Sequence, residues 1–145
     1  MKALILPGHL DSLSAIRHYV NDAAAQAGLD KKSAYHLQLA VDEIATNIIV
    51  HGYDQAGLAG EVTVQAVINQ ATLTMSLEDT SAPFDPRHFT RPDHIDKPIK
   101  ERPIGGLGVF MAMKNVDRFD YEYVNNRNRN SFIINRPPNV STSTD

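Results

Sequence analysis

Residues 43–47 read Glu-Ile-Ala-Thr-Asn and lie inside an apolar stretch that runs from Leu37 to Val50. On a helix, residues four apart are separated by about 400° of rotation, so Glu43 and Asn47 stand one above the other and can reach one ligand. A carboxylate beside a carboxamide is typical of a general base next to a metal ligand. The same spacing also suits two solvated polar residues, so the rest of the chain has to decide between these interpretations.

The chain has the length and composition of one globular domain. Its 145 residues are 42% hydrophobic, which is enough for a core without a disulfide or a structural metal. The absence of cysteine excludes disulfides and thiolate chemistry and suits a reducing compartment. No apolar run is long enough for a signal peptide or a membrane span, so the cytoplasm is the expected location. The net charge of -3 argues against direct nucleic-acid binding.

Hydrophobic periodicity predicts two helices followed by a hairpin. Apolar residues recur at helical spacing over about 10–27, and a second helix is expected from its N-cap Asp30 to near Gly52. Apolar and polar residues then alternate over 62–68 and 73–77, which predicts two paired antiparallel strands.

The remaining elements are expected to be short. They are a strand at 2–6, a proline-rich lid at about 85–103, a helix from 105 to 116, a strand at 119–123, a polar turn at 125–130, a closing strand at 132–134 and a disordered tail at 137–145.

This order of elements predicts an α+β fold, a two-layer sandwich with helices packed on one face of a mostly antiparallel mixed sheet. Residues 1–136 are expected to form the one domain. A dinucleotide-binding fold is disfavoured, because Met111 stands where the third glycine of GxGxxG would be after Gly105. The chain also has no GK[ST] sequence for a Walker loop.

Two more segments contain candidate ligand contacts. Gly105, Gly106, Leu107 and Gly108 enter a helix, where unencumbered backbone N–H groups and the helix dipole suit an anion such as phosphate. Asp79 ends a hydrophobic strand, where a carboxylate needs a hydrogen-bond partner and an adenine amino group is one. The alternatives are a flexible linker before a core helix and an aspartate that caps the following turn.

The Glu43/Asn47 pair, Asp79 and the glycine turn at 105–108 follow one another along the chain. This ordered set resembles the Bergerat-type ATP-binding fold of gyrase, heat-shock chaperone and histidine-kinase ATPases. Within that superfamily, the chain is similar to the bacterial anti-sigma-factor serine kinases over about residues 3–135. The residues that carry the resemblance are LAVDEIATN at 39–47, HGY at 51–53, Asp79 with PFDP at 83–86, GGLGV at 105–109 and VDRFDY at 116–121.

The resemblance implies ATP and Mg²⁺ as cofactors and a role for each candidate residue. Asn47 would give its side-chain oxygen to Mg²⁺, an ion that usually keeps water and phosphate ligands and needs few from the protein. Glu43 would be the general base that takes the proton from an incoming seryl or threonyl hydroxyl. Asp79 would bind the adenine amino group, and residues 105–108, including Leu107, would hold the phosphates under the lid.

The function implied by the resemblance is that of an anti-sigma regulatory factor with ATP-dependent serine/threonine protein kinase activity. Its expected partners are a sigma factor and a small anti-anti-sigma protein of the STAS type, and homodimerisation is a further family expectation. One position departs from the family, which has a glycine where this chain has Ser81. A serine there requires a different turn or leaves a less open adenine site. The alternative function is therefore a nucleotide-gated or nucleotide-independent protein-binding switch without phosphotransfer.

Other polar residues point less clearly to chemistry. The histidines have no HxxxH or HxH spacing, which disfavours a histidine metal site. His51, one turn after Asn47, is expected to be a hydrogen-bonded histidine at a helix end, and Tyr121 is expected to pack in the core. A detached histidine-kinase catalytic domain is also disfavoured, because the chain has no helical hairpin with a phosphoacceptor histidine.

Overall fold

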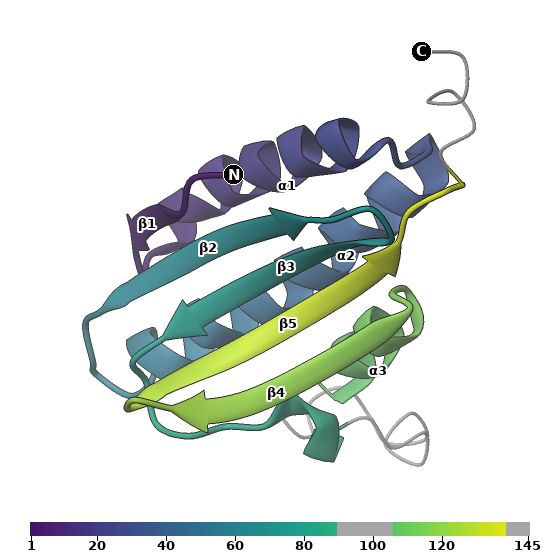
Figure 1. Ribbon diagram of the computed structural model, residues 1–145. Helices are drawn as coiled ribbons and strands as arrows, with labels where there is room; N and C mark the ends of the chain where they lie inside the picture. Colours follow the sequence, from purple (N-terminus) through teal and green to yellow (C-terminus); the bar gives the residue numbers. More distant parts are fainter. Residues whose placement is uncertain (90–105, 139–145) are drawn as a thin grey trace.

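Five strands form one antiparallel sheet, and the helices pack on one of its faces (Figure 1). The computed structural model describes residues 1–89 and 106–138. The strands are β1 (Leu4–Pro7), β2 (Glu61–Ile68), β3 (Thr72–Asp79), β4 (Arg118–Val124) and β5 (Arg127–Asn135), in the order β1-β2-β3-β5-β4. The helices are α1 (Leu13–Ala27), α2 (Lys31–Asn47) and α3 (Gly106–Lys114). The predicted two-layer α+β fold is confirmed, and all pairings among the described strands are antiparallel.

The ends of the first two helices follow from their capping residues. A 3₁₀ turn at Leu10–Ser12 precedes α1, which ends at Gly28 in the left-handed conformation with φ 75°, where glycine has no steric cost. The side chain of Asp30 accepts a hydrogen bond from the backbone N–H of Ser33 at 2.7 Å and so caps α2. Both boundaries agree with the sequence prediction.

The central hairpin also forms as predicted. The side-chain Oδ1 of Asn69 accepts hydrogen bonds from the N–H groups of Ala71 and Thr72, each at 2.8 Å, which closes the turn between β2 and β3. The alternate residues that point toward the helices are fully buried: Val62, Val64, Ala66, Leu73, Met75 and Leu77. This alternation fixes the register, because a shift by one residue would expose the whole set.

The second helical run ends near Gly52 as predicted, at Asp54, but its last part is a π-helical segment, Ile48–Asp54. The predicted bounds of the polar turn are wrong. The polar turn occupies only Asn125 and Asn126, with φ of 55° and 61°, and β5 begins at Arg127. Two positive φ values match the strand twist of a tight hairpin, and β5 was hidden in the sequence because its first inward-facing residues are polar.

Tyr53, near the end of the π-helical segment, holds three parts of the chain together. Its ring lies between two glycines: a Cβ atom added at Gly8 would come within 2.4 Å of it, and one at Gly60 within 2.5 Å. Its hydroxyl donates to the carbonyl of Glu61 at 2.7 Å and accepts from the N–H of Thr80 at 2.9 Å. The residue after Asp79 is therefore tied to the start of β2 and to the helical layer.

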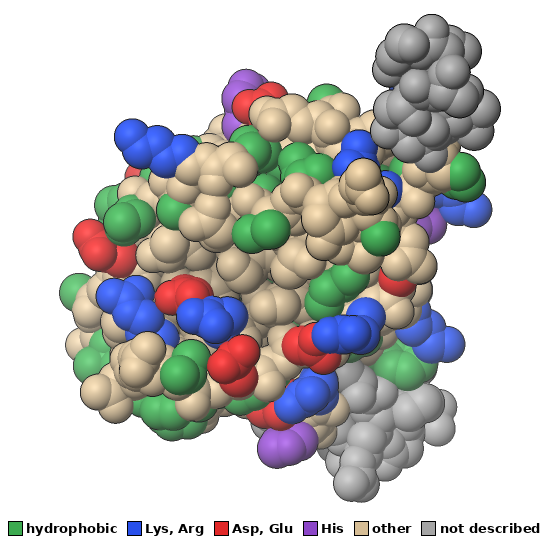
Figure 2. Space-filling view, in the orientation of Figure 1, with side chains coloured by type: hydrophobic (Ala, Val, Ile, Leu, Met, Phe, Trp, Pro, Cys, Tyr) green, Lys and Arg blue, Asp and Glu red, His purple; other side chains and the backbone are tan. Residues whose placement is uncertain are grey.

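The face of the sheet away from the helices is open, and Figure 2 views it directly. Uncharged polar side chains cover much of this face, and charged ones gather over β4 and the neighbouring end of β5. There Arg129 pairs with Glu78 at 2.7 Å and Arg118 with Asp120 at 2.6 Å. Such exposed pairs contribute about 0–1 kcal/mol each, so the fold depends on the buried face.

Some predicted segments fall largely outside the described residues. Of the predicted lid, one 3₁₀ turn is described at Pro86–Phe89, whereas residues 90–105 lie outside, as do residues 139–145 of the predicted tail. Among residues 1–89 and 106–138, no helix has the length and apolar character needed to cross a bilayer.

Candidate functional site

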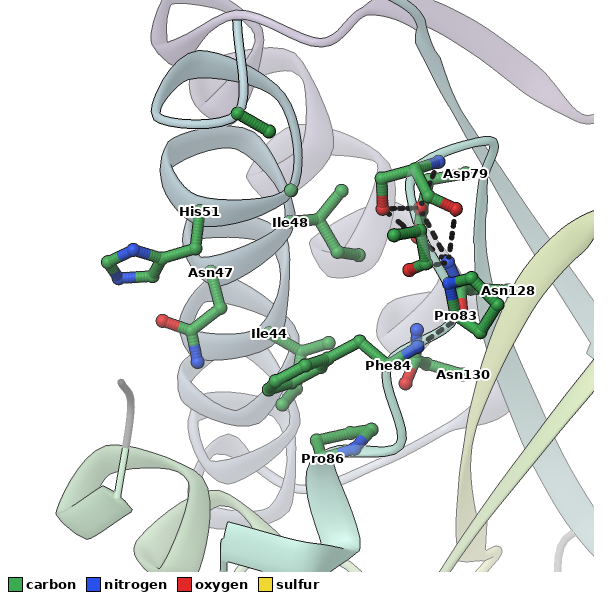
Figure 3. Close-up of a pocket in the computed structure, with 14 residues that line it drawn as sticks. Ile44, Asn47, Ile48, His51, Asp79, Pro83, Phe84, Pro86, Asn128 and Asn130 are labelled. Carbon is green, nitrogen blue, oxygen red and sulfur yellow. Dashed lines mark hydrogen bonds between the residues drawn. The ribbon is translucent and has the colours of Figure 1, made fainter. Parts of the chain in front are cut away.

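A cavity of about 180 Å³ opens between α2 and the neighbouring ends of β3 and β5 (Figure 3). Its walls come from segments far apart in the sequence. The lining residues are Ile44, Asn47, Ile48, His51, Gly52, Ala56, Asp79, Ser81, Ala82, Pro83, Phe84, Pro86, Asn128 and Asn130. The fold thus brings two of the predicted site residues, Asn47 and Asp79, to one cavity.

Asp79 is 1% exposed, and its two carboxylate oxygens have different surroundings. Oδ1 accepts hydrogen bonds from the backbone N–H of Ser81 at 3.0 Å, from the Ser81 hydroxyl at 2.5 Å and from Nδ2 of Asn128 at 3.0 Å. Oδ2 is buried and has no partner among the described residues. One oxygen therefore holds the side chain in place and the other is left for a donor from a ligand.

Ser81, which departs from the family pattern, leaves this second oxygen open. Its backbone does not have a positive φ, so the turn here differs from one that requires glycine. Its hydroxyl bonds Oδ1 of Asp79 and lies close to Gly52, where an added Cβ would be 2.8 Å from the Ser81 Oγ. The serine thus fits in space that Gly52 provides and does not engage the unpartnered Oδ2.

Three buried polar atoms on the cavity wall have no hydrogen-bond partner within the described parts of the chain. They are Nδ2 of Asn47, Oδ2 of Asp79 and Oδ1 of Asn130. Buried polar groups are normally paired, so three unpaired atoms around one cavity indicate a site built for a polar ligand. The side chains of Ile44, Ile48 and Phe84 lie between them (Figure 3) and suit a flat apolar ring.

Glu43 lies at the contact between α2 and α3. A Cβ added at Gly108 would come within 2.3–2.4 Å of the Glu43 carboxylate atoms, so a larger residue there would displace the carboxylate. Burial raises the pKa of Glu43 above its ordinary value of 4.5; the nearby Asn47 amide opposes the shift, the charge of Asp42 adds to it, and that of His51 opposes it. The Asn47 amide lowers the pKa by its proximity, because its Nδ2 has no hydrogen-bond partner among the described residues.

The predicted phosphate-binding glycines are only partly described. Gly105 lies outside the described residues, whereas Gly106 and Leu107 begin α3. Gly108 faces the Glu43 carboxylate, so the structure brings the predicted base and the glycine turn together. Binding of phosphate by this turn stays a prediction.

Sequence reasoning missed two asparagines of β5. Asn128 and Asn130 are 1% and 2% exposed and were assigned to a polar turn. A signal was present, because two asparagines two residues apart lie on the same face of a strand. Tyr121 was expected only to pack, but its hydroxyl donates to Oδ1 of Asn128. His51 behaves as expected, with its Nδ1 hydrogen-bonded to Oε1 of Gln55 at 2.7 Å.

Comparison with known proteins identifies the family. Residues 6–134 match the family described as the histidine kinase-like ATPase domain. The chain belongs to the histidine kinase-like ATPase family. The match covers nearly all of the chain and includes both walls of the cavity.

Individual relatives of this histidine kinase-like ATPase support the resemblance to the anti-sigma-factor serine kinases. The serine-protein kinase RsbW of Bacillus cereus is 26% identical over 109 residues, which are 73% of this chain and 67% of the relative. The serine-protein kinase RsbW of Listeria monocytogenes serotype 4a is 28% identical over 111 residues, 74% of this chain and 70% of the relative. The predicted family resemblance is confirmed.

A divalent metal ion bound by the described residues of this histidine kinase-like ATPase would have few protein ligands. In the described part of the chain, no group of three or more histidine and acidic side chains is placed to hold a metal ion. Asn47 offers a carboxamide oxygen at the cavity wall, and Mg²⁺ accepts one such ligand together with water and phosphate oxygens. The residues present therefore fit Mg²⁺ that arrives with a nucleotide.

Glu43→Gln is expected to make this histidine kinase-like ATPase more stable at neutral pH. Because the pKa of Glu43 is raised in the folded state, folding opposes its ionisation. The free-energy cost of ionising Glu43 in the folded protein is absent below its ordinary pKa. It grows as the pH rises through the raised pKa of the folded state and is complete above that pKa. Thermal unfolding should show a melting temperature about 1–3 °C above wild type at about pH 7.5, with the difference vanishing toward about pH 4.

The exposed Glu61 provides the control for this measurement. Glu61→Gln should shift the melting temperature little and equally at both pH values. A Glu43→Gln protein that is less stable than wild type at pH 7.5 would show that the ionised carboxylate stabilises the fold.

Proposed function

We propose that this chain is an ATP- and Mg²⁺-dependent serine/threonine protein kinase that also acts as an anti-sigma factor. The observation that carries the proposal is the cavity in which Asn47, Asp79 and Asn130 each present a buried polar atom without a partner. Membership of the histidine kinase-like ATPase family and relatives named serine-protein kinases support it.

Adenine fits the apolar part of the cavity. Its exocyclic amino group would donate to Oδ2 of Asp79, the buried oxygen that has no partner among the described residues, while the ring packs between Ile48 and Phe84. A hydrogen bond to a charged acceptor contributes about 1.5–3 kcal/mol. The triphosphate would then lie toward Asn47 and the predicted glycine turn.

Asn47 would hold the magnesium ion, and Glu43 would handle the proton. Bound Mg²⁺ neutralises charge on the phosphates and aligns them for transfer. Glu43 stands one helical turn before Asn47, and its raised pKa makes it a better proton acceptor than an ordinary glutamate. It would accept the proton of a seryl or threonyl hydroxyl as that oxygen attacks the terminal phosphorus, the bond from this phosphorus to the bridging oxygen breaks, and ADP leaves.

The proposed protein partners follow from the family resemblance. They are a small anti-anti-sigma protein of the STAS type, which supplies the hydroxyl, and a sigma factor, which the chain would sequester. Because the proposed partners belong to the transcription machinery, we propose the cytoplasm as the location of this activity. We also propose that the chain forms a homodimer.

One observation favours a second candidate, a nucleotide-gated binding switch without phosphotransfer. The Glu43 carboxylate packs against Gly108 and is not among the residues that line the cavity. If this contact remained after ATP binding, Glu43 would have no access to a hydroxyl. Nucleotide binding would then change the affinity for the partner protein without phosphotransfer.

Two measurements test the proposals together. Isothermal titration with Mg·ATP should show binding, and incubation with γ-labelled ATP and a candidate anti-anti-sigma protein of the STAS type should label a serine or threonine of that protein. Binding with no label transfer favours the switch. No binding of Mg·ATP contradicts both candidates.

A further inference from the structure

We infer that Asn128 and Tyr121 are positioning residues that set the preference of the cavity for a 6-amino purine over a 6-oxo purine. This inference rests on the proposed ATP-binding function and adds residues to it. Neither residue was assigned a role in nucleotide binding from the sequence. Both act through Asp79 and through the chain segment that follows it.

Asn128 uses all of its side-chain hydrogen-bonding groups within the protein. Its Nδ2 donates to Oδ1 of Asp79 at 3.0 Å and lies 3.1 Å from the carbonyl oxygens of Ser81 and Ala82. Its Oδ1 accepts from the backbone N–H of Phe84 at 3.0 Å. The reversed amide would set an oxygen against three oxygens, so this orientation is the only one that satisfies the group.

Tyr121 completes this arrangement from the edge strand β4. Its hydroxyl donates to Oδ1 of Asn128 and accepts from the N–H of Phe84 at 3.2 Å. Burial raises the pKa of the Tyr121 hydroxyl, so it remains a donor at neutral pH. The β4–β5 hairpin is thereby joined to residues 81–84, which form one wall of the cavity.

The consequence is a fixed direction for the free oxygen of Asp79. Since Asn128 and Ser81 hold Oδ1, the carboxylate cannot turn or shift away from the base without weakening these bonds. Oδ2 therefore presents an acceptor to the ligand. A 6-amino group donates to it, whereas the 6-oxo group of inosine would face it as a second acceptor and leave both unpaired.

Loss of either positioning residue should relax this selectivity. Asn128 has no hydrogen-bonding group left for a nucleotide, so its effect has to pass through Asp79. Removing the neutral hydrogen bond by which Tyr121 holds Asn128 should reduce discrimination about 3–10-fold, because a carboxylate that is held less firmly can move away from an opposing 6-oxo group. Binding of the triphosphate part, common to both nucleotides, should change little.

The test compares the dissociation constants of Mg·ATP and Mg·ITP by isothermal titration for the full chain and three variants. Tyr121→Phe removes only the hydroxyl, and Asn128→Ala removes the whole amide. Tyr123→Phe is the matched control, because Tyr123 lies on the same strand and is 43% exposed. The ratio of the two constants does not depend on the fraction of protein that is folded, so general destabilisation leaves it unchanged.

We expect a preference for ATP in wild type and in Tyr123→Phe, and a ratio about 3–10-fold smaller in Tyr121→Phe. Asn128→Ala should lose at least as much. Tyr121→Phe alone decides the outcome if the alanine variant does not fold. A wild-type preference for ATP that Tyr121→Phe retains in full overturns this inference and leaves the proposed function standing. Failure of wild type to bind Mg·ATP overturns both.

Discussion

Asp79→Asn is expected to weaken the binding of Mg·ATP by about 10–100-fold, which corresponds to the loss of one hydrogen bond to a charged acceptor. The variant keeps one carbonyl oxygen, which can still accept from Ser81 and Asn128 as Oδ1 does. Its amide nitrogen then takes the place of the unpartnered Oδ2 and meets the adenine amino group donor to donor. Because this nitrogen suits a 6-oxo group, the preference should reverse toward Mg·ITP.

Titration of both nucleotides checks this result, with Asp120→Asn as the control. Asp120 lies on the open face of the sheet, where it pairs with Arg118 at 2.6 Å, so its variant should bind both nucleotides as wild type does. If Asp79→Asn binds Mg·ATP as tightly as wild type, the base does not lie against this carboxylate.

Glu43→Gln is expected to lower the rate of phosphoryl transfer by about 10²–10⁴-fold, the usual contribution of a general base. The amide keeps the shape of the side chain against Gly108 but cannot accept the proton of the attacking hydroxyl. Binding of Mg·ATP should change little, because Glu43 is not among the residues that line the cavity. Single-turnover transfer of labelled phosphate, measured beside the nucleotide dissociation constant, separates the two effects.

Glu61→Gln is a matched control for this experiment, since it makes the same exchange at an exposed glutamate. Glu61 begins β2 and is not among the residues that line the cavity, so transfer should remain close to the wild-type rate. Undiminished transfer by Glu43→Gln would exclude Glu43 as the base and leave it a structural contact between α2 and α3.

The elements that could be predicted from the sequence are those whose signals are local. Helix α2 was predicted with its N-cap at Asp30 because the cap and the buried stripe lie within the helix itself. The β2–β3 hairpin was predicted because its inward residues are apolar up to Asp79 at the end of β3. The joint position of Asn47 and Asp79 at one cavity was reached through the family resemblance, since no local pattern brings two distant residues together.

What escaped prediction depends on contacts between distant segments. Strand β5 begins with inward-facing Asn128 and Asn130, which are polar because they serve the cavity and not the core. Because these two inward residues are polar, the apolar–polar alternation that marks a strand is missing from this part of the sequence. The close approach of Glu43 to Gly108 was missed as well, because it requires α2 and α3 to be packed before it can be seen.

Gly52 and Ser81 divide a space that holds only one small side chain. Since a Cβ at Gly52 would lie 2.8 Å from the Ser81 hydroxyl, the serine is compatible with the cavity wall only while position 52 is glycine. A relative with glycine in place of Ser81 would have room for alanine at position 52. Because Gly52 lies in the HGY sequence that carries the family resemblance, the room for Ser81 is already part of the family pattern, and the serine at this position does not close the cavity.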